Sequence, residues 1–337
     1  MTKSLDKRKK GIYVRFVYDK TMPDEMLDFF LKKMDIQGKE EIIPGQRYHN
    51  RKDLMGFPTF GRKDLTFKPM PPVAHKKLHG KTSMIDEVVK QDLMLHYPYQ
   101  KFDYVVDLLR EAAIDPTVRS IRINLYRVAS NSQVINALEN AARNGKKVVV
   151  VVELQARFDE ENNIGVSESL QDAGVKVIFG VPGLKVHSKL ILISRRIKGK
   201  SQRVAHIGTG NFHEKTARIY GDVSLLTADR RLTNEVRKLF SFFENNYERS
   251  VFRHLLVSPY NNRRKIEGLI QNEIRNAKAG KKAWIEFKVN NLVDENIIKK
   301  LYAASKAGVK VKLIVRGVCS LIPGVPGLSE NISVISI

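Results

Sequence analysis

A histidine flanked by two lysines is the part of the sequence best suited to chemistry. His187 lies in the segment LKVHSKL, with Lys185 two residues before it and Lys189 two residues after it. In a strand, the alternation of side chains places all three on one face. Because neighbouring cations disfavour protonation of an imidazole, we expect His187 to be neutral and nucleophilic. A histidine on a strand is more often structural, so this pattern alone does not define a site.

A glycine-rich turn follows the histidine by about 20 residues. Residues 208–211 read GTGN. The backbone N–H groups of such a turn can cradle an oxyanion, and Asn211 adds an amide donor. The histidine and the turn together indicate a site for an anionic group.

Three arginines stand at the ends of apolar runs that resemble strands. Arg127 follows residues 121–125, Arg157 follows residues 148–154, and Arg316 follows residues 311–315. Ligands of α/β sheets gather at the carboxyl ends of parallel strands, where a guanidinium can bind two phosphate oxygens at once. Each arginine alone could equally be a surface residue, but three at equivalent places favour phosphate binding.

The order of expected elements is typical of an α/β fold. Amphipathic and Val/Ile-rich segments alternate from residue 103 onward. The expected helices are 103–113 and 132–144, and the expected strands are 120–126, 147–154, 175–179, 185–194 and 203–208. Before them we expect a strand at 13–18, a helix at 23–34 and a turn-rich basic segment at 45–81.

An internal repeat divides the chain. Residues 120–154 and 283–316 both read strand, polar loop, helix, glycine and strand, at an offset of about 163 residues. General strand–helix–strand grammar explains part of this likeness, and duplication explains the rest. We predict three domains, an α+β head segment at 1–72, a first α/β domain at 73–254 and an incomplete second one at 255–337.

The charge of the chain indicates an anionic partner. The 337 residues carry 59 Lys and Arg against 36 Asp and Glu, a net charge of +23. Nucleic acid, an anionic membrane surface and a polyphosphorylated ligand all fit this excess, as does a solvated basic surface. No apolar run approaches the roughly 18 residues that span a bilayer, and no signal peptide is evident, so we expect a cytoplasmic location.

Several common catalytic motifs are missing from the sequence. It contains no HExxH, CxxC or GxSxG segment, and the GKT at residues 80–82 lacks the first glycine of a P-loop. A single cysteine, Cys319, excludes an internal disulfide and a cysteine-rich zinc site, and we expect it to be buried. Zinc protease and serine hydrolase functions therefore have no local support.

At the level of motifs, the chain resembles the long bacterial type of polyphosphate kinase, within the phospholipase D-like superfamily. The matching segments occur in family order and cover nearly the whole chain. They are residues 47–50 (RYHN), 57–58 (FP), 96–99 (HYPY), 125–127 (LYR), 153–160 (ELQARFDE), 183–189 (GLKVHSK), 208–212 (GTGNF), 216–220 (TARIY) and 315–324 (VRGVCSLIPG).

This resemblance assigns roles to individual residues. It implies that His187 is the phosphohistidine and that Tyr220 and Arg316 bind ATP. Arg127 and Arg157 fall on positions that the family associates with magnesium. Because guanidinium groups have no lone pair for a cation, we interpret these two arginines as phosphate clamps.

The resemblance also implies a fold and a reaction. It implies two phospholipase D-like domains of mixed sheet flanked by helices, the second incomplete. His187 would take the γ-phosphate of ATP and pass it reversibly to inorganic polyphosphate, with Lys189 and Mg²⁺ neutralising charge. We expect Asn211 to bind phosphate and Asp222 to orient His187. The implied partners are ATP, ADP and polyphosphate, in a homo-oligomer that requires no nucleic acid and is compatible with peripheral membrane association.

Two other functions stay open on the sequence. A phospholipase D-like phosphodiesterase would use the same histidine, although the carboxylate of the superfamily motif HxKxxxxD is replaced by Ser194. A non-catalytic module would bind nucleic acid or another polyanion through its basic surface. The N-terminal domain of the family and a second motif histidine are not found, so we expect a fragment that is inactive by itself.

Overall fold

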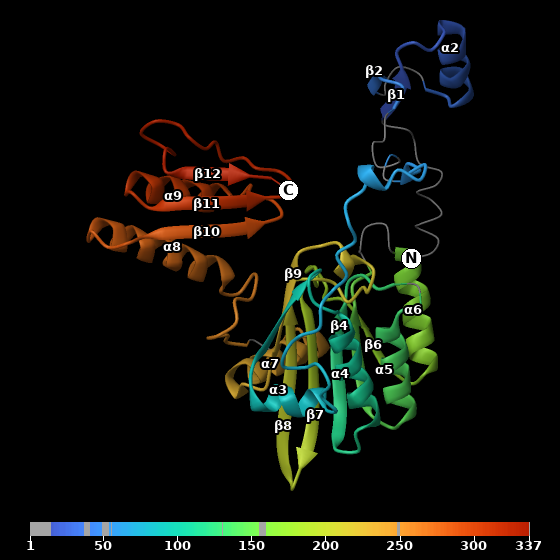
Figure 1. The fold of residues 1–337 in the computed structure, drawn as a ribbon, viewed down its shortest axis with the longest axis vertical. Coiled ribbons are helices and arrows are strands. Elements are labelled where there is room, and N and C mark those ends of the chain that lie inside the picture. The colour runs from blue at the N-terminus through green and yellow to red at the C-terminus, as the bar shows by residue number, and fades with distance from the viewer. Residues whose placement is uncertain are drawn as a thin grey trace.

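The structure, a computed structural model, contains three separate sheets in the part of the chain that it describes (Figure 1). A two-stranded sheet comes first, a seven-stranded sheet follows, and a three-stranded sheet comes last.

Arg157 lies outside the residues that the structure describes, which are 15–36, 41–48, 54, 56–129, 131–154, 160–247 and 250–336. None of the helices in the described segments is long and apolar enough to cross a membrane.

The seven-stranded sheet is mixed, with strand order β3-β9-β8-β7-β4-β5-β6. Strands β4, β5 and β6 run parallel, whereas β7 pairs antiparallel with β4 on its other side. This arrangement confirms the expected mixed sheet flanked by helices. Its strands are β3 (Leu93–Tyr97), β4 (Val118–Leu125), β5 (Lys147–Val152), β6 (Lys176–Phe179), β7 (Lys189–Ile197), β8 (Lys200–Gly208) and β9 (Asp222–Thr227).

Helices cover both faces of this sheet, and the run of valines in β5 shows why. Val150 and Val152 belong to the core beneath four helices, whereas Val151 belongs to the core beneath α7. Because side chains alternate along a strand, an unbroken apolar run is what a strand covered on both faces requires. The four helices are α3 (Met84–Lys90), α4 (Asp103–Ile114), α5 (Gln133–Arg143) and α6 (Glu160–Asp172), and α7 is Arg230–Glu244.

The second α/β unit repeats the order of the first. Its parallel strands are β10 (Trp284–Val289), β11 (Lys310–Val315) and β12 (Ile332–Ile335). Helices α8 (Asn262–Lys278) and α9 (Glu295–Lys306) pack on one another, as α4 and α5 do. Within the repeated order one connection differs, because α6 joins β5 to β6 whereas residues 316–331 join β11 to β12 without a helix.

The two repeated helices end in the same way. Gly145 after α5 and Gly308 after α9 both adopt left-handed backbone conformations, with φ of 75° and 88°. Glycine meets this requirement without steric cost, which is why it closes helices before a change of direction. The internal repeat of the sequence is therefore also a repeat of local structure.

The head segment contains a two-stranded sheet and a helix. Strands β1 (Arg15–Asp19) and β2 (Glu41–Gly45) pair in parallel and flank α2 (Asp24–Lys33) in the chain. Cys319, expected to be buried, is exposed. It lies in the loop that follows β11 and forms an isolated parallel bridge with Leu292.

Candidate active site

His187 lies in the segment just before β7, not inside the strand as expected. Two side chains from neighbouring strands take up the backbone groups of this segment. Glu153 accepts a hydrogen bond from the Val186 N–H at 2.8 Å. Asn124 donates to the Ser188 carbonyl and accepts from the N–H of Leu190 at 2.8 Å. Because side chains satisfy these groups, the segment needs no ladder with the next strand.

The imidazole of His187 is held by one lysine and one tyrosine. Its Nδ1 atom lies 3.1 Å from Nζ of Lys189, and its ring meets the Tyr126 ring edge-on with centroids 4.5 Å apart. Burial lowers the pKa of His187, and the charges of Lys189 and Lys185 lower it further. The direction of the pKa shift agrees with the expectation of a neutral imidazole, but burial contributes more to the shift than the neighbouring cations do.

Tyr126 gathers cations around the histidine. The Nζ atoms of Lys189 and Lys185 lie 5.0 Å and 5.7 Å from the centroid of its ring, and the guanidinium carbon of Arg127 lies 5.7 Å from it. An aromatic ring attracts cations through its quadrupole and so offsets part of their mutual repulsion. Tyr126 follows β4 directly, but sequence reasoning gave it no role.

Lys189 is a charged group in a largely dehydrated place. Only 4% of its surface is exposed. Burial lowers its pKa to about 8, an effect that Asp222 opposes and Arg127 strengthens. Its Nζ also donates to the His187 carbonyl oxygen. A bound anion stabilises the charged form of such a lysine, because its negative charge compensates for the hydration that burial removes.

The turn at residues 208–211 packs against Asp222. Thr209 donates its hydroxyl hydrogen to Asp222 Oδ1 at 2.8 Å. A Cβ atom at Gly210 would lie 2.8 Å from the carboxyl group of Asp222, so only glycine fits here. Asn211 Oδ1 is buried and has no hydrogen-bond partner among the described residues. The oxyanion cradle stays a prediction for this turn.

The placement of Asp222 differs from the expectation that it orients His187. Its carboxylate contacts Thr209, and its charge acts on the pKa of Lys189. The carboxylate that acts on the pKa of His187 is Glu153, which raises it against the larger opposing effects. Glu153 also holds the backbone before the histidine. Sequence reasoning missed Glu153 because its partner is more than 30 residues away.

A second histidine lies beneath the turn. His206 is 1% exposed, and burial lowers its pKa to about 4. Its Nε2 atom lies 2.7 Å from the Ser224 hydroxyl, and a Cβ atom at Gly208 would lie 2.6 Å from its ring. This neutral imidazole fills the space under the start of the turn. Its position in β8, a strand of mixed polar and apolar residues, gave no signal beyond its residue type.

Tyr220 and Arg316 meet although they belong to different α/β units. The guanidinium carbon of Arg316 lies 5.8 Å from the centroid of the Tyr220 ring. The Arg316 Nε atom donates to Asn290 Oδ1 at 2.9 Å. A second contact joins the units, since Lys288 Nζ lies 3.4 Å from the carbonyl oxygen of Gly221. The family resemblance implied that both residues bind ATP, and the structure brings their side chains together.

The described residues offer no cage for a metal ion. Within the described segments no group of three or more His, Cys, Asp or Glu side chains could hold one. The site around His187 is lined by cations, Arg127 among them, and a guanidinium has no lone pair to donate. These residues do not fit a protein-bound Mg²⁺ ion, which prefers oxygen ligands.

The fold and this site together define an α/β protein with a histidine surrounded by cationic side chains. Three family models match the chain. They are the polyphosphate kinase middle domain over residues 1–57, C-terminal domain 1 over residues 83–249, and C-terminal domain 2 over residues 255–337. The chain belongs to the polyphosphate kinase family.

Individual relatives agree with this assignment. A polyphosphate kinase from Vibrio parahaemolyticus is 56% identical over the whole of this chain and 48% of its own length. One from Escherichia coli is 51% identical over the whole chain and 49% of its own length. The chain thus spans about half the length of the curated relatives it matches.

A solved structure matches the fold as well. The polyphosphate kinase from Porphyromonas gingivalis superposes with a TM-score of 0.84 at 43% identity, covering 96% of this chain and 49% of that one. A phospholipase D family member from Salmonella typhimurium aligns with 47% of this chain and 93% of its own, at 14% identity and a TM-score of 0.36, too low to support an inference.

Proposed function

We propose that this chain supplies the phosphohistidine centre of a polyphosphate kinase, which transfers the γ-phosphate of ATP reversibly to the end of inorganic polyphosphate. The observation that carries the proposal is the setting of His187. Its imidazole, of lowered pKa, touches Tyr126, and Lys185, Lys189 and Arg127 stand around the same ring. This arrangement combines a nucleophile with the charge needed to bind a polyanion.

The proposed reaction has two steps. Attack by Nε2 requires the neutral tautomer whose proton is on Nδ1, the nitrogen that faces Lys189. In this tautomer Lys189 donates to the His187 carbonyl oxygen, and Nε2 keeps its lone pair. Its lone pair forms a bond to the γ-phosphorus, the bond from that phosphorus to the bridging oxygen breaks, and ADP leaves. A terminal oxygen of polyphosphate then attacks the phosphorus, and the electron pair of the P–N bond returns to His187. A covalent intermediate divides one transfer between two polyanions into two simpler transfers.

The cationic residues stabilise the charge of the transferred group. The transition state of phosphoryl transfer is loose, so catalysis depends mainly on position and charge. Lys189 and Arg127 are proposed to hold the phosphoryl oxygens, joined by Arg157 through the family resemblance. Tyr220 and Arg316 are proposed to bind the nucleotide, and Asn211 the phosphate.

Magnesium belongs to this proposal as a companion of the substrate. Since the described residues do not fit a protein-bound ion, we assign Mg²⁺ to the phosphates of ATP, whose charge it neutralises. The proposed setting is a cytoplasmic homo-oligomer. The net charge of +23 supports binding of polyphosphate and is compatible with peripheral contact with an anionic membrane.

Labelling with ATP that carries radioactive γ-phosphate tests the proposal. A full-length polyphosphate kinase that contains this sequence should acquire acid-labile label on His187, and His187→Ala should lose both the label and polyphosphate synthesis. His79→Ala, at an exposed histidine, is the control and should keep both. Acid-stable label on Ser or Thr, or normal turnover by a folded His187→Ala protein, would contradict the proposal. Cleavage of a phosphodiester to a phosphomonoester and an alcohol would favour the hydrolase instead.

A further inference from the structure

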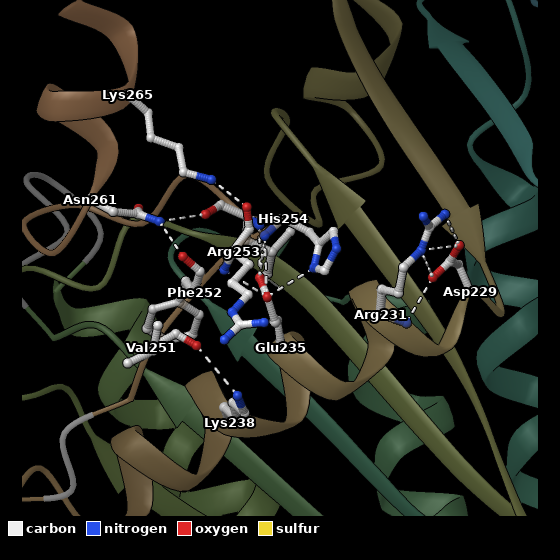
Figure 2. A network of polar contacts seen from close by, with 11 residues as sticks. Asp229, Arg231, Glu235, Lys238, Val251, Phe252, Arg253, His254, Asn261 and Lys265 are labelled. Atoms are coloured by element: carbon white, nitrogen blue, oxygen red, sulfur yellow. Dashed lines mark hydrogen bonds and ion pairs between the residues drawn. The ribbon is translucent and has the colours of Figure 1, made fainter. Parts of the chain in front are cut away.

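A buried glutamate of the first α/β unit binds the segment that leads to the second. Glu235 lies in the middle of α7 and is 5% exposed. Its carboxylate accepts hydrogen bonds from three consecutive backbone N–H groups, those of Arg253 at 2.7 Å, His254 at 3.0 Å and Leu255 at 2.8 Å (Figure 2). The Nδ1 atom of His254 lies 3.0 Å from it as well. We call residues 251–257 the linker.

The carbonyl groups of the linker are also bound. From α7, Lys238 Nζ lies 3.3 Å from the Val251 carbonyl oxygen. From α8 in the second unit, Lys265 donates to the carbonyl of Arg253. Figure 2 shows these groups converging on the linker from both sides. The linker is therefore tied to both units at once.

Asn261, immediately before α8, closes the second half of the network. Its Nδ2 donates to the carbonyl oxygens of Phe252 at 2.8 Å and Leu255 at 3.0 Å, and its Oδ1 accepts from the N–H of Val257 at 2.7 Å. Phe252 and Val257 pack into the same core as α7. The chain thus enters α8 from a fixed position and direction.

The hydrogen bonds of Glu235 stabilise its ionised form. Burial raises the pKa of this carboxyl, but the bonds from Leu255, Arg253 and His254 outweigh burial and hold the pKa below its usual range. Hydrogen bonds to a charged acceptor are stronger than neutral ones. Removing the charge of Glu235 leaves several buried N–H groups poorly paired. The free-energy cost of such unpaired groups exceeds the net stabilisation that the hydrogen bonds provide.

The linker matters because of what lies beyond it. The second unit reaches back to the first at Tyr220, where Arg316 lies 5.8 Å from the ring centroid, and at Gly221, which Lys288 contacts. We propose that Glu235 is a positioning residue, which fixes the linker so that Arg316 is presented to Tyr220. This inference rests on the proposed function for the assignment of these two residues to ATP. A fixed linker lowers the conformational entropy lost when the nucleotide joins the two units.

A purely structural role for Glu235 would affect all properties of the enzyme together, whereas positioning affects ATP binding selectively. In the full-length enzyme, Glu235→Gln should raise KM for ATP about tenfold while kcat changes less than about threefold, the pattern of a lost binding contribution. Glu244→Gln is the matched control, because Glu244 lies on the same helix and its ion pairs among the described residues are with Arg122 and Lys176 of the first unit. Its KM should stay within about twofold of wild type.

Hydrogen exchange gives a readout that needs no activity. The amides of residues 253–255 should exchange at least about tenfold faster in Glu235→Gln, while amides in the middle of α7 keep their protection. Lys265→Met, which removes only one contact to the linker, provides a second variant if Glu235→Gln does not fold, and should change the same amides and KM in the same direction. Unchanged exchange at 253–255 would overturn the inference. So would a fall in kcat of Glu235→Gln as large as its rise in KM, or an equal rise in KM in the control Glu244→Gln.

The two proposals fail in different ways. If His187 acquires no label in the wild-type enzyme, the proposed function fails, yet the exchange of the linker amides still decides whether Glu235 fixes the linker. If His187 is labelled normally and Glu235→Gln leaves KM for ATP unchanged, the positioning role is wrong and the proposed function stands.

Discussion

The Nζ atom of Lys189 lies 3.1 Å from Nδ1 of His187, so the candidate nucleophile has a lysine where a carboxylate would be the usual orienting partner. Lys189 is bonded at the same time to the backbone carbonyl of His187. The pKa values of both side chains are lowered, that of Lys189 to about 8. The pair therefore titrates on both sides of neutral pH.

This pair predicts a bell-shaped pH profile for kcat/KM of histidine phosphorylation. A protonated His187 has no lone pair, so the rate should fall as pH drops through its pKa, which lies below 6.5. Lys189 loses its positive charge as pH rises through about 8, so the rate should fall there too. Lys189→Arg should shift the alkaline limb well above this pH, because a guanidinium stays charged. An alkaline limb that is the same in both proteins would show that Lys189 does not cause it.

Substitutions of Tyr126 should separate its ring from its hydroxyl. Tyr126→Phe keeps the ring that contacts His187 and should stay within about twofold of wild type in single-turnover labelling. Tyr126→Leu removes the ring and its cation contacts, worth roughly 1–2 kcal/mol in total, and should slow labelling about tenfold or more. Thermal unfolding of both variants controls for loss of fold. Equal labelling rates for Tyr126→Phe and Tyr126→Leu would show that the Tyr126 ring does not contribute to the reaction.

Gly210→Ala should destabilise the turn beside Asp222. The new Cβ atom would lie 2.8 Å from the carboxyl group of Asp222, and overpacking of this kind costs about 1–3 kcal/mol. Gly165→Ala is the control, because nothing lies within 4 Å of its Cβ position and alanine favours the helix. Denaturant unfolding of the two variants should give opposite changes in stability. Combining Gly210→Ala with Asp222→Ala should restore part of the loss, since the contact with the carboxyl group is removed while the contact with Asp222 Cβ at 2.9 Å stays.

The chain itself should bind polyphosphate in a salt-dependent way. Its basic residues release counterions when they meet a polyanion, so affinity should fall about tenfold or more between roughly 50 and 200 mM salt. Because the chain spans about half the length of its relatives, we expect it not to sustain polyphosphate synthesis alone. Binding measured at several salt concentrations and chain growth followed on a gel check both expectations. Growth at the rate of a full-length relative would contradict the second.

Local patterns determined the order of elements and the residue types of the site. The alternation of helices with apolar strands, the repeated glycines after α5 and α9, and the arginines that follow β4 and β11 were all predictable from sequence. Each depends on periodicity or turn chemistry within about a dozen residues. The flanking of His187 by two lysines is equally local, and the structure keeps all three around one ring.

Only tertiary structure decided what surrounds His187. The antiparallel pairing of β7 with β4 brings Tyr126 and Asn124 to a segment some 60 residues later in the chain. It also buries Lys189, and the packing of the turn directs Asp222 to Thr209 rather than to His187. Contacts of this kind depend on which strands pair and in which register, and no periodicity within a single segment encodes that choice.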